Sequence, residues 1–184
     1  LGLQAPKGLA FDGTLLWTAD PAARQIHGFD AASGQRVKTL PVQVPPEKGY
    51  RSIEALAWDG QHLWTAIAAG FSSSFNQIDS NSGEILRSLF ADCDPRGLAV
   101  DSGRLWSLSF NGERHPPLVD QRDLASEESA VVRSRRFLRP TDGRDPSGLF
   151  FDGQFLWALD ATAKRATRFL PVEARKPPQK PTYR

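Results

Sequence analysis

Four residues that could form a polar cluster occupy one repeated place in the sequence. Each lies ten positions before a tryptophan, and the four are Lys7, Glu54, Arg96 and Ser147. The residues around this place repeat closely, whereas the residue type at the place itself changes. A site for an asymmetric ligand needs a different side chain from each repeat. We therefore expect the four side chains to surround the mouth of a channel, with Lys7, Glu54 and Arg96 as ligand-binding residues. The alternative is that these four positions are simply exposed and vary in residue type without binding anything.

Two aspartates, Asp20 and Asp160, come three positions after the first and the last of these tryptophans. If the two ends of the chain meet, these carboxylates become neighbours, and Asp145 lies in the loop before the last repeat. Such a cluster could pair as acid and base, or hold a hard cation such as calcium. Asp145 precedes a proline, so a turn-forming role competes with binding. We count all three as ligand-binding candidates and predict no cofactor, with calcium as the alternative.

Histidine adds one further candidate. His27 lies on a predicted strand, His62 in a predicted hairpin turn and His115 in a loop, so the three are not expected to share a metal or a catalytic site. His115 alone could line the mouth. The chain has no serine nucleophile elbow, no phosphate-binding glycine loop and no metalloprotease motif. We predict no catalytic residue.

An internal repeat must position these residues. Four segments align without a gap, and each has a short apolar run, a turn with Asp and Gly, and then Leu-Trp: residues 8–17, 55–64, 97–106 and 148–157. Successive tryptophans are 47, 42 and 51 residues apart. Constant spacing inside a unit and variable spacing between units are typical of rigid modules joined by loops.

Each unit is predicted to be a small antiparallel sheet. Asp-Gly favours a tight hairpin turn, and a second hairpin with an Asp-to-Gly turn follows at residues 30–34 and 79–83. Four short strands in a unit of about 46 residues match a blade of a β-propeller. We predict an all-β fold, a β-propeller of four blades with up to four antiparallel strands each, either complete or part of a larger ring.

The large apolar residues of the repeat are expected to lie between neighbouring blades. This set contains the four tryptophans of the repeat and three aromatic residues of the innermost strands: Trp17, Trp64, Trp106, Trp157, Phe11, Trp58 and Phe151. Small residues on the innermost strands would let neighbouring blades approach closely. Burial of the aromatic side chains is expected to be the main stabilising term.

The domain is expected to span residues 1–172, with blades at about 5–50, 51–92, 93–143 and 144–172. Residues 1–4 would complete the last blade, and the proline-rich residues 173–184 are expected to be a tail or linker. We favour a closed ring of four blades and a monomer. The alternative is part of a larger ring, completed by further sequence or by a second copy in a homodimer.

Charge and hydropathy exclude two classes of partner. Residues 173–184 carry a net charge of +3, which leaves −1 on residues 1–172. A nucleic-acid-binding domain would carry its positive charge as a patch on the fold, so no nucleic-acid partner is expected. No apolar run approaches the roughly 20 residues of a membrane-spanning helix.

The repeat resembles that of a known group of proteins. Gly-Leu-Ala-Phe-Asp-Gly, then Leu-Trp-Thr-Ala-Asp and Ile-His-Gly-Phe-Asp-Ala-Ala-Ser-Gly, is similar to the repeat of bacterial propellers of the NHL, YVTN and glutamine-cyclotransferase-like kinds. The resemblance covers most of residues 5–170. It implies the architecture and leaves the activity open, because such proteins include lyases, lactonases, cyclotransferases and binding scaffolds. Similar repeats are frequent in exported bacterial proteins, which is consistent with a periplasmic or secreted location, but the compartment stays open.

The resulting functional prediction is a non-enzymatic binding or scaffold domain. It would present one face of the propeller to a protein partner or a small-molecule ligand. The alternative is an enzyme of the lyase, lactonase or cyclotransferase type, acting at the channel mouth through Asp20, Asp160, Glu54 and Arg96. A sugar-binding lectin would need equivalent aromatic residues in the loops of every blade, and the sequence lacks them.

Overall fold

The chain forms β-strands throughout the part that the structure describes. This computed structural model describes residues 2–42, 52–68, 73–91, 93–101, 103–109, 118–125, 132–137 and 146–169. These residues form fifteen strands in four antiparallel sheets, each with its strands in sequence order, and they contain no helix. The predicted all-β fold with four blades is confirmed.

The four sheets are named here as blades 1 to 4. Blade 1 holds β1 (Lys7–Phe11), β2 (Leu15–Asp20), β3 (Gln25–Asp30) and β4 (Arg36–Pro41). Blade 2 holds β5 (Ser52–Trp58), β6 (Leu63–Ala68), β7 (Ser73–Ile78) and β8 (Ile85–Ala91). Blade 3 holds β9 (Pro95–Asp101), β10 (Arg104–Ser109), β11 (Leu118–Asp123) and β12 (Val132–Phe137). Blade 4 holds β13 (Pro146–Phe151), β14 (Leu156–Asp160) and β15 (Arg165–Phe169).

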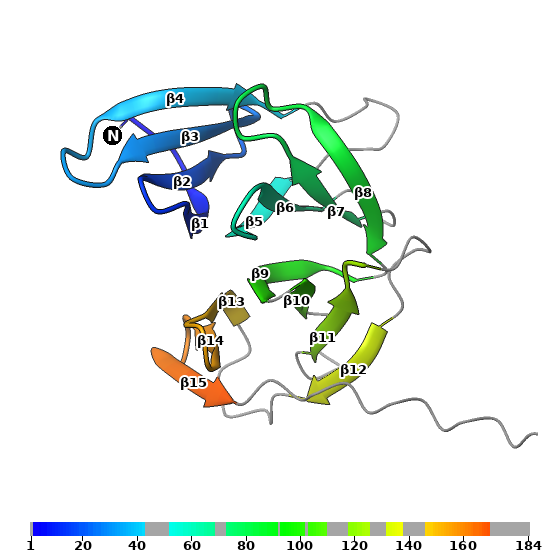
Figure 1. Ribbon diagram of the computed structural model, residues 1–184. Coiled ribbons are helices and arrows are strands. Elements are labelled where there is room, and N and C mark those ends of the chain that lie inside the picture. The colour runs from blue at the N-terminus through cyan, green and yellow to red at the C-terminus, as the bar shows by residue number, and fades with distance from the viewer. Residues whose placement is uncertain are drawn as a thin grey trace, which may run out of the picture.

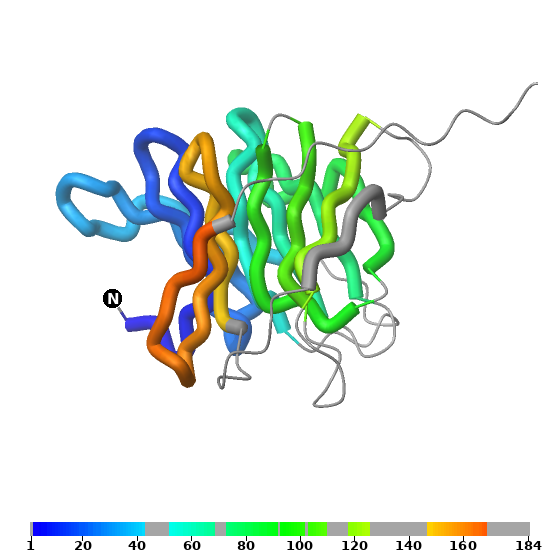
Figure 2. The backbone as a smooth tube through the Cα atoms, turned by 90° about the horizontal axis from the view of Figure 1, so that it is seen from below, coloured from blue at the N-terminus to red at the C-terminus, as the bar shows by residue number. Residues whose placement is uncertain are grey.

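The blades fan out from a common axis along which their first strands lie. Figure 1 shows β1, β5, β9 and β13 innermost, with the later strands of each blade progressively farther out. In Figure 2, turned by 90°, the inner strands of the four blades are upright and side by side, whereas the light-blue hairpin of β3 and β4 leans away from them. β1 packs against β5, β5 against β9, and β9 against β13. The inner strands therefore form one continuous arc.

The arc does not close within one chain. Among the described strands, β1 and β13 make no contact of the extent that joins neighbouring blades, and Figure 1 shows the opening between blades 1 and 4. The favoured four-bladed closed ring is therefore wrong for the described residues. Residues 2–6 form no strand, so blade 4 has three described strands and is not completed by the N-terminal segment. Residues 173–184 lie outside the described residues.

The Asp-Gly turn holds the first hairpin of three blades through one repeated set of hydrogen bonds. The indole N–H of Trp17 donates to Asp12 Oδ2 at 2.7 Å, and the backbone N–H groups of Thr14 and Leu15 donate to Asp12 Oδ1. Asp59 with Trp64, and Asp152 with Trp157, repeat this arrangement at 2.8 and 2.7 Å. One carboxylate therefore fixes both the turn and the tryptophan rotamer.

Blade 3 lacks this bond. Asp101 instead accepts a hydrogen bond from Arg104 at 2.7 Å, and the buried indole N–H of Trp106 has no hydrogen-bond partner among the described residues. Arginine at the residue after the turn competes successfully for the carboxylate because its guanidinium brings a full positive charge. The hairpin of blade 3 is thus held by its strand ladder and by packing.

Neighbouring blades are joined by apolar contacts between two different faces. Each blade has a Trp face, which carries the repeat tryptophan and packs on the next blade, and a Leu face, which packs on the previous one. Trp17, Trp64 and Trp106 are 1%, 1% and 0% exposed in three successive cores. The Leu faces meet them with Leu56, Leu98 and Leu149. Aromatic and leucine side chains are therefore buried between blades, as predicted.

Four of the seven predicted core residues are not fully buried, and two of them, Phe11 and Trp157, lie on the free faces of the end blades. Phe11 is 51% exposed, because no blade precedes the Leu face of blade 1. Trp157 is only half-buried, because no blade follows the Trp face of blade 4. Trp58 and Phe151, which correspond to Phe11, are partly covered by the preceding blade. The tryptophans that correspond to Trp157 are fully covered by the next blade.

Glycine permits the closest contacts between inner strands. A Cβ atom on Gly8 would lie 2.6 Å from the backbone nitrogen of Leu56, and one on Gly97 would lie 2.6 Å from that of Leu149. Such distances exclude any side chain, so these glycines set how near one blade can stand to the next.

Replacing the buried Trp64 by alanine should destabilise the fold far more than the same change at half-buried Trp157. Loss of a fully buried aromatic side chain costs about 3–5 kcal/mol, which corresponds to a fall in melting temperature of about 10 °C in a domain of this size. Thermal unfolding followed by circular dichroism measures both variants. Equal losses in Trp64→Ala and Trp157→Ala would contradict the assignment of the cores.

The Asp-Gly turn should make stability depend on pH. Burial raises the pKa of Asp59, but hydrogen bonds from His62, Trp64 and Gln61 outweigh it and hold the pKa below its usual 3.8. A lowered folded-state pKa stabilises the fold above the unfolded value, and the effect is lost as the pH falls through the folded value. Asp59→Asn should therefore melt below the parent near neutral pH, and the gap should narrow below about pH 4. A gap of constant size would contradict this role.

Candidate functional site

A β-bulge at the start of each inner strand displaces one residue from the strand ladder. In β5, Ile53 pairs with Ile67 and Ala55 with Ala66, so Glu54 has no partner across the ladder. The same irregularity leaves out Arg96 in β9 and Ser147 in β13. In β1 the ladder is irregular between Lys7 and Ala10. Bulges re-aim side chains at the rims of sheets, which explains why this repeat position carries polar residues.

Three charged residues at this repeat position in the first three blades form one ion-paired cluster, named here the mouth cluster: Lys7, Glu54 and Arg96. Lys7 Nζ donates to Glu54 Oε2 at 2.6 Å, and Arg96 Nη1 lies 3.9 Å from the same oxygen. The Glu54 side chain is only 10% exposed, whereas those of Lys7 and Arg96 are 39% and 36% exposed. The structure thus brings these three predicted residues together. Their binding of a ligand stays a prediction.

Arg96 has a second partner that the sequence pattern did not single out for this site. Its Nη2 atom donates to Asp94 Oδ2 at 2.9 Å, and the Asp94 side chain is 46% exposed. Asp94 precedes a proline, a sequence that is typical of a turn and does not by itself indicate a binding residue. The signal that could have identified it is its separation of two residues from Arg96 across the bulge, which returns both side chains to the same end of the strand.

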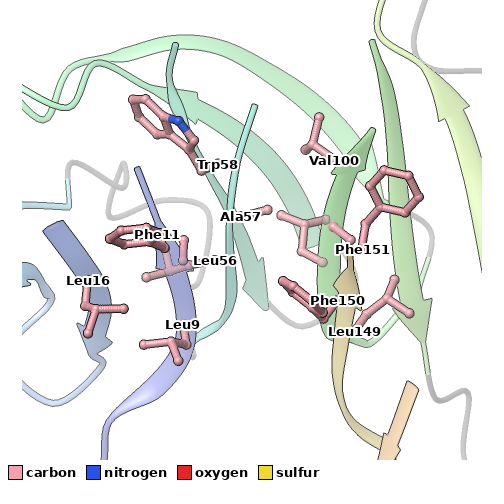
Figure 3. A pocket seen from close by; sticks show the side chains of 13 residues that line it. Leu9, Phe11, Leu16, Leu56, Ala57, Trp58, Val100, Leu149, Phe150 and Phe151 are labelled. Atoms are coloured by element: carbon pink, nitrogen blue, oxygen red, sulfur yellow. The ribbon is translucent and has the colours of Figure 1, made fainter. Parts of the chain in front are cut away.

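An apolar cavity lies beneath the mouth cluster. Glu54, Arg96 and Ser147 line a cavity of about 410 Å³ whose remaining lining is largely apolar, including Leu9, Leu56, Leu98, Leu149 and Phe150. The same five apolar residues line a second cavity of about 290 Å³, drawn in Figure 3. That cavity continues along the inner strands and has only apolar and aromatic side chains around it, among them Phe11, Trp58 and Phe151. A few polar groups over an apolar floor are typical of small-molecule sites.

Asp20 and Asp160 make the same local hydrogen bond in blades 1 and 4. Asp20 Oδ1 accepts a hydrogen bond from the backbone N–H of Ala23 at 3.2 Å, and Asp160 Oδ1 accepts one from that of Ala163 at 2.8 Å. Each caps the turn between the second and third strands. The turns end at Arg24 and Lys164, which have positive φ values of 53° and 49°. Each carboxylate therefore caps a separate turn, and ligand binding by Asp20 and Asp160 stays a prediction.

The remaining candidates fall outside the site that the structure describes. His115 and Asp145 are not among the described residues. His27 is buried in blade 1, where its Nδ1 atom lies 3.0 Å from Thr39 Oγ1 and desolvation, with Arg36 nearby, lowers its pKa. His62 lies at the Asp-Gly turn of blade 2 and contacts Gln77. Within the described ranges, no three His, Cys, Asp or Glu side chains are grouped so that they could hold a metal ion.

Three solved structures show which known fold this arrangement matches. Glutaminyl cyclase from Myxococcus xanthus has a TM-score of 0.63 and 12% identity, over 91% of this chain and 73% of that one. A streptogramin B lyase structure has a TM-score of 0.58 and 13% identity, over 93% and 56%. Kuenenia stuttgartiensis hydrazine synthase has a TM-score of 0.56 and 20% identity, over 83% and 43%.

The fold is a β-propeller. At these identities the likeness extends to the architecture alone. This chain spans about half of the length of the lyase and of the hydrazine synthase chains that it matches. No protein-family model and no curated protein sequence matches the chain. The described residues include no helix that could span a membrane.

The charge of Glu54 should stabilise the first three blades by a modest, salt-dependent amount. Glu54→Gln keeps the shape and removes the charge that Lys7 and Arg96 share, so a loss of about 1 kcal/mol is expected for this partly exposed cluster. Thermal melts in low salt and in about 1 M NaCl measure the effect, which screening should largely remove. A loss that is the same in both buffers would show that the charges do not carry it.

Proposed function

We propose that the chain is a binding domain that takes up an amphipathic ligand bearing one anionic group at the channel mouth. The observation that carries the proposal is the position of the mouth cluster over an apolar cavity of about 410 Å³. Polar groups at the entrance would orient the ligand, and the leucine-lined floor would supply most of the affinity.

The exposure of the cluster favours an anion. Lys7 and Arg96 present more of their side chains to solvent than Glu54, which lies between them. Asp94 offsets part of the charge of Arg96 from one side. An incoming carboxylate or similar group could therefore pair with Lys7 and with the free edge of the guanidinium, while its apolar part covers Leu56 and Leu98. A small molecule and the carboxyl end of a peptide both have this chemistry.

The enzymatic alternative depends on acidic residues that the fold uses elsewhere. Asp20 and Asp160, the expected acid and base, each cap a turn through a backbone hydrogen bond. Two of the similar structures are an enzyme called a cyclase and one called a lyase. These names describe those proteins, and at 12% and 13% identity they lend no activity to this chain. Binding is therefore the function that the site supports.

Octanoate and octanol provide a matched pair of probes, because they differ in charge at one end. The parent chain should bind octanoate more tightly than octanol in isothermal titration calorimetry. Arg96→Gln and Lys7→Gln should each weaken octanoate binding by about tenfold, the usual cost of one lost charged contact of about 1.4 kcal/mol. Neither change should alter octanol binding.

Lys38→Gln is the control, because Lys38 is a cation on β4 that pairs with Asn81 away from the mouth. It should leave binding of both probes unchanged. Equal affinity for octanoate and octanol, or octanoate binding that survives both mouth variants, would refute the proposed site.

A further inference from the structure

The exposed apolar side chains of this molecule gather around the axis. Among the described residues, seven large apolar side chains are exposed, and three of them lie on the outer strands β4 and β8. The other four line one or both of the two axial cavities: Leu9, Phe11, Phe150 and Leu159. They belong to blades 1 and 4, which stand on the two sides of the opening in Figure 1. Apolar groups that face water together around a cavity are typical of a ligand site.

The two cavities follow each other along the innermost strands. The cavity below the mouth cluster reaches the first residues of these strands, and the second cavity reaches their last residues. Both share one middle layer, which contains a leucine from each blade: Leu9, Leu56, Leu98 and Leu149. Together they form one groove, named here the axial groove. It runs from the mouth cluster to an aromatic layer, labelled in Figure 3, that contains Phe11, Trp58 and Phe151.

The length of the axial groove follows from β5. Glu54 at the mouth and Trp58 at the far end are four residues apart on this strand, and the inner strands stand upright in Figure 2. Four extended residues contain about twelve backbone bonds and span about 13 Å. An extended alkyl chain of about twelve carbons has a similar number of bonds and a similar length. Octanoate would therefore leave the far part of the groove unfilled.

The charges at the two ends of the axial groove give it a direction. The mouth cluster supplies Lys7 and Arg96, whose side chains are more exposed than that of Glu54. At the opposite end, each innermost strand ends at or just before the aspartate of its Asp-Gly turn: Asp12, Asp59, Asp101 and Asp152. A carboxylate at that end would meet like charges, and the cavity beside it has only apolar and aromatic side chains. An anionic chain is therefore expected to lie with its carboxylate at the mouth.

We propose that the axial groove holds an unbranched fatty acid of about twelve carbons, with its carboxylate at Lys7 and Arg96 and its alkyl chain along the innermost strands. This inference rests on the proposed function and extends its site to the whole axis. The alkyl chain would cover Leu9, Phe11 and Phe150, which face water in its absence. Methylene groups suit the far cavity better than peptide groups do, because buried peptide groups need hydrogen-bond partners.

A series of straight-chain carboxylates from octanoate to tetradecanoate tests the inference by isothermal titration calorimetry, at concentrations below micelle formation. Full burial of a methylene group improves binding by about fourfold. The axial groove is open between blades 1 and 4, so about half of that free energy, a factor of about two for each added carbon, is expected. Dodecanoate should therefore bind at least about tenfold more tightly than octanoate. Tetradecanoate should bind little more tightly than dodecanoate.

Two exposed side chains separate the near part of the groove from the far part. Phe11 lines the far cavity alone, and Leu159 lines the near cavity alone. Phe11→Ser should remove most of the gain from octanoate to dodecanoate. Leu159→Ser should weaken the binding of both ligands by a similar factor and keep that gain.

Phe90→Ser is the matched control for Phe11→Ser. Phe90 is 54% exposed on β8, outside both cavities, and Phe11 is 51% exposed. The control should leave both affinities unchanged. All three variants should keep the circular dichroism spectrum of the parent, since none of the three side chains is buried.

Dodecanedioate tests the direction of the chain, because it carries a second carboxylate at the end that would reach the aromatic layer. It should bind about tenfold more weakly than dodecanoate, since burial of that charge has no partner there. Equal binding of the two ligands would overturn the inference, because the chain would then not end in the far cavity.

The remaining outcomes separate this inference from the proposed function. Equal affinity for octanoate and dodecanoate, with octanoate binding still weakened by Arg96→Gln, overturns the inference and leaves the proposed function standing. A gain with chain length that both Arg96→Gln and Lys7→Gln leave unchanged refutes the proposed function, and the inference with it. A dimer in sedimentation velocity that Phe11→Ser dissociates would assign the groove to a second copy of the chain and would also overturn the inference.

Discussion

Contact between unlike faces of neighbouring sheets is the interaction on which this molecule depends. A four-stranded sheet of about six residues per strand cannot cover its own apolar side chains in water. Here each sheet has two apolar faces, and each face is buried only by the opposite face of a neighbour. The tryptophan of one blade and the leucine of the next form each core, and the carboxylate of the Asp-Gly turn fixes the tryptophan in the rotamer that this packing needs. Contacts between blades therefore contribute more to the stability of the fold than contacts within one blade.

The repeat made much of this fold predictable. The nine-residue spacing from the first residue of each unit to its tryptophan identified the first hairpin of every blade, and the tryptophans of the interior seams are buried as expected. Closure of the ring could not be predicted in the same way. It depends on the rotation between neighbouring blades, which is set by the fit of side chains and by the closest backbone approach at Gly8 and Gly97. A linear pattern of residue types does not contain that angle.

The candidate site was predictable to a similar degree. Lys7, Glu54 and Arg96 meet because they hold one repeated position at the start of successive inner strands, where each strand ladder is irregular, so a repeated sequence position becomes a repeated place in space. Asp20 and Asp160 also occupy one repeated position, but this position begins a turn. A carboxylate at the start of a turn accepts a hydrogen bond from a nearby backbone N–H group, which holds it in the turn. Both sets occupy a repeated sequence position, and the binding of a ligand by either set stays a prediction. The two sets differ in the local backbone: Glu54 and Arg96 lie at bulges, whereas Asp20 and Asp160 accept hydrogen bonds within turns.

The pairing of one Leu face with one Trp face has a consequence for the history of such chains. Any sheet of this build offers the same two sides to its neighbours, so a whole unit can be duplicated in, or deleted from, the gene without rewriting the units beside it. A small residue at the start of the inner strand, glycine in three units and Ala55 in the second, travels with the unit and leaves room for the neighbour. Rings of different size can therefore arise from one ancestral module by changes in copy number.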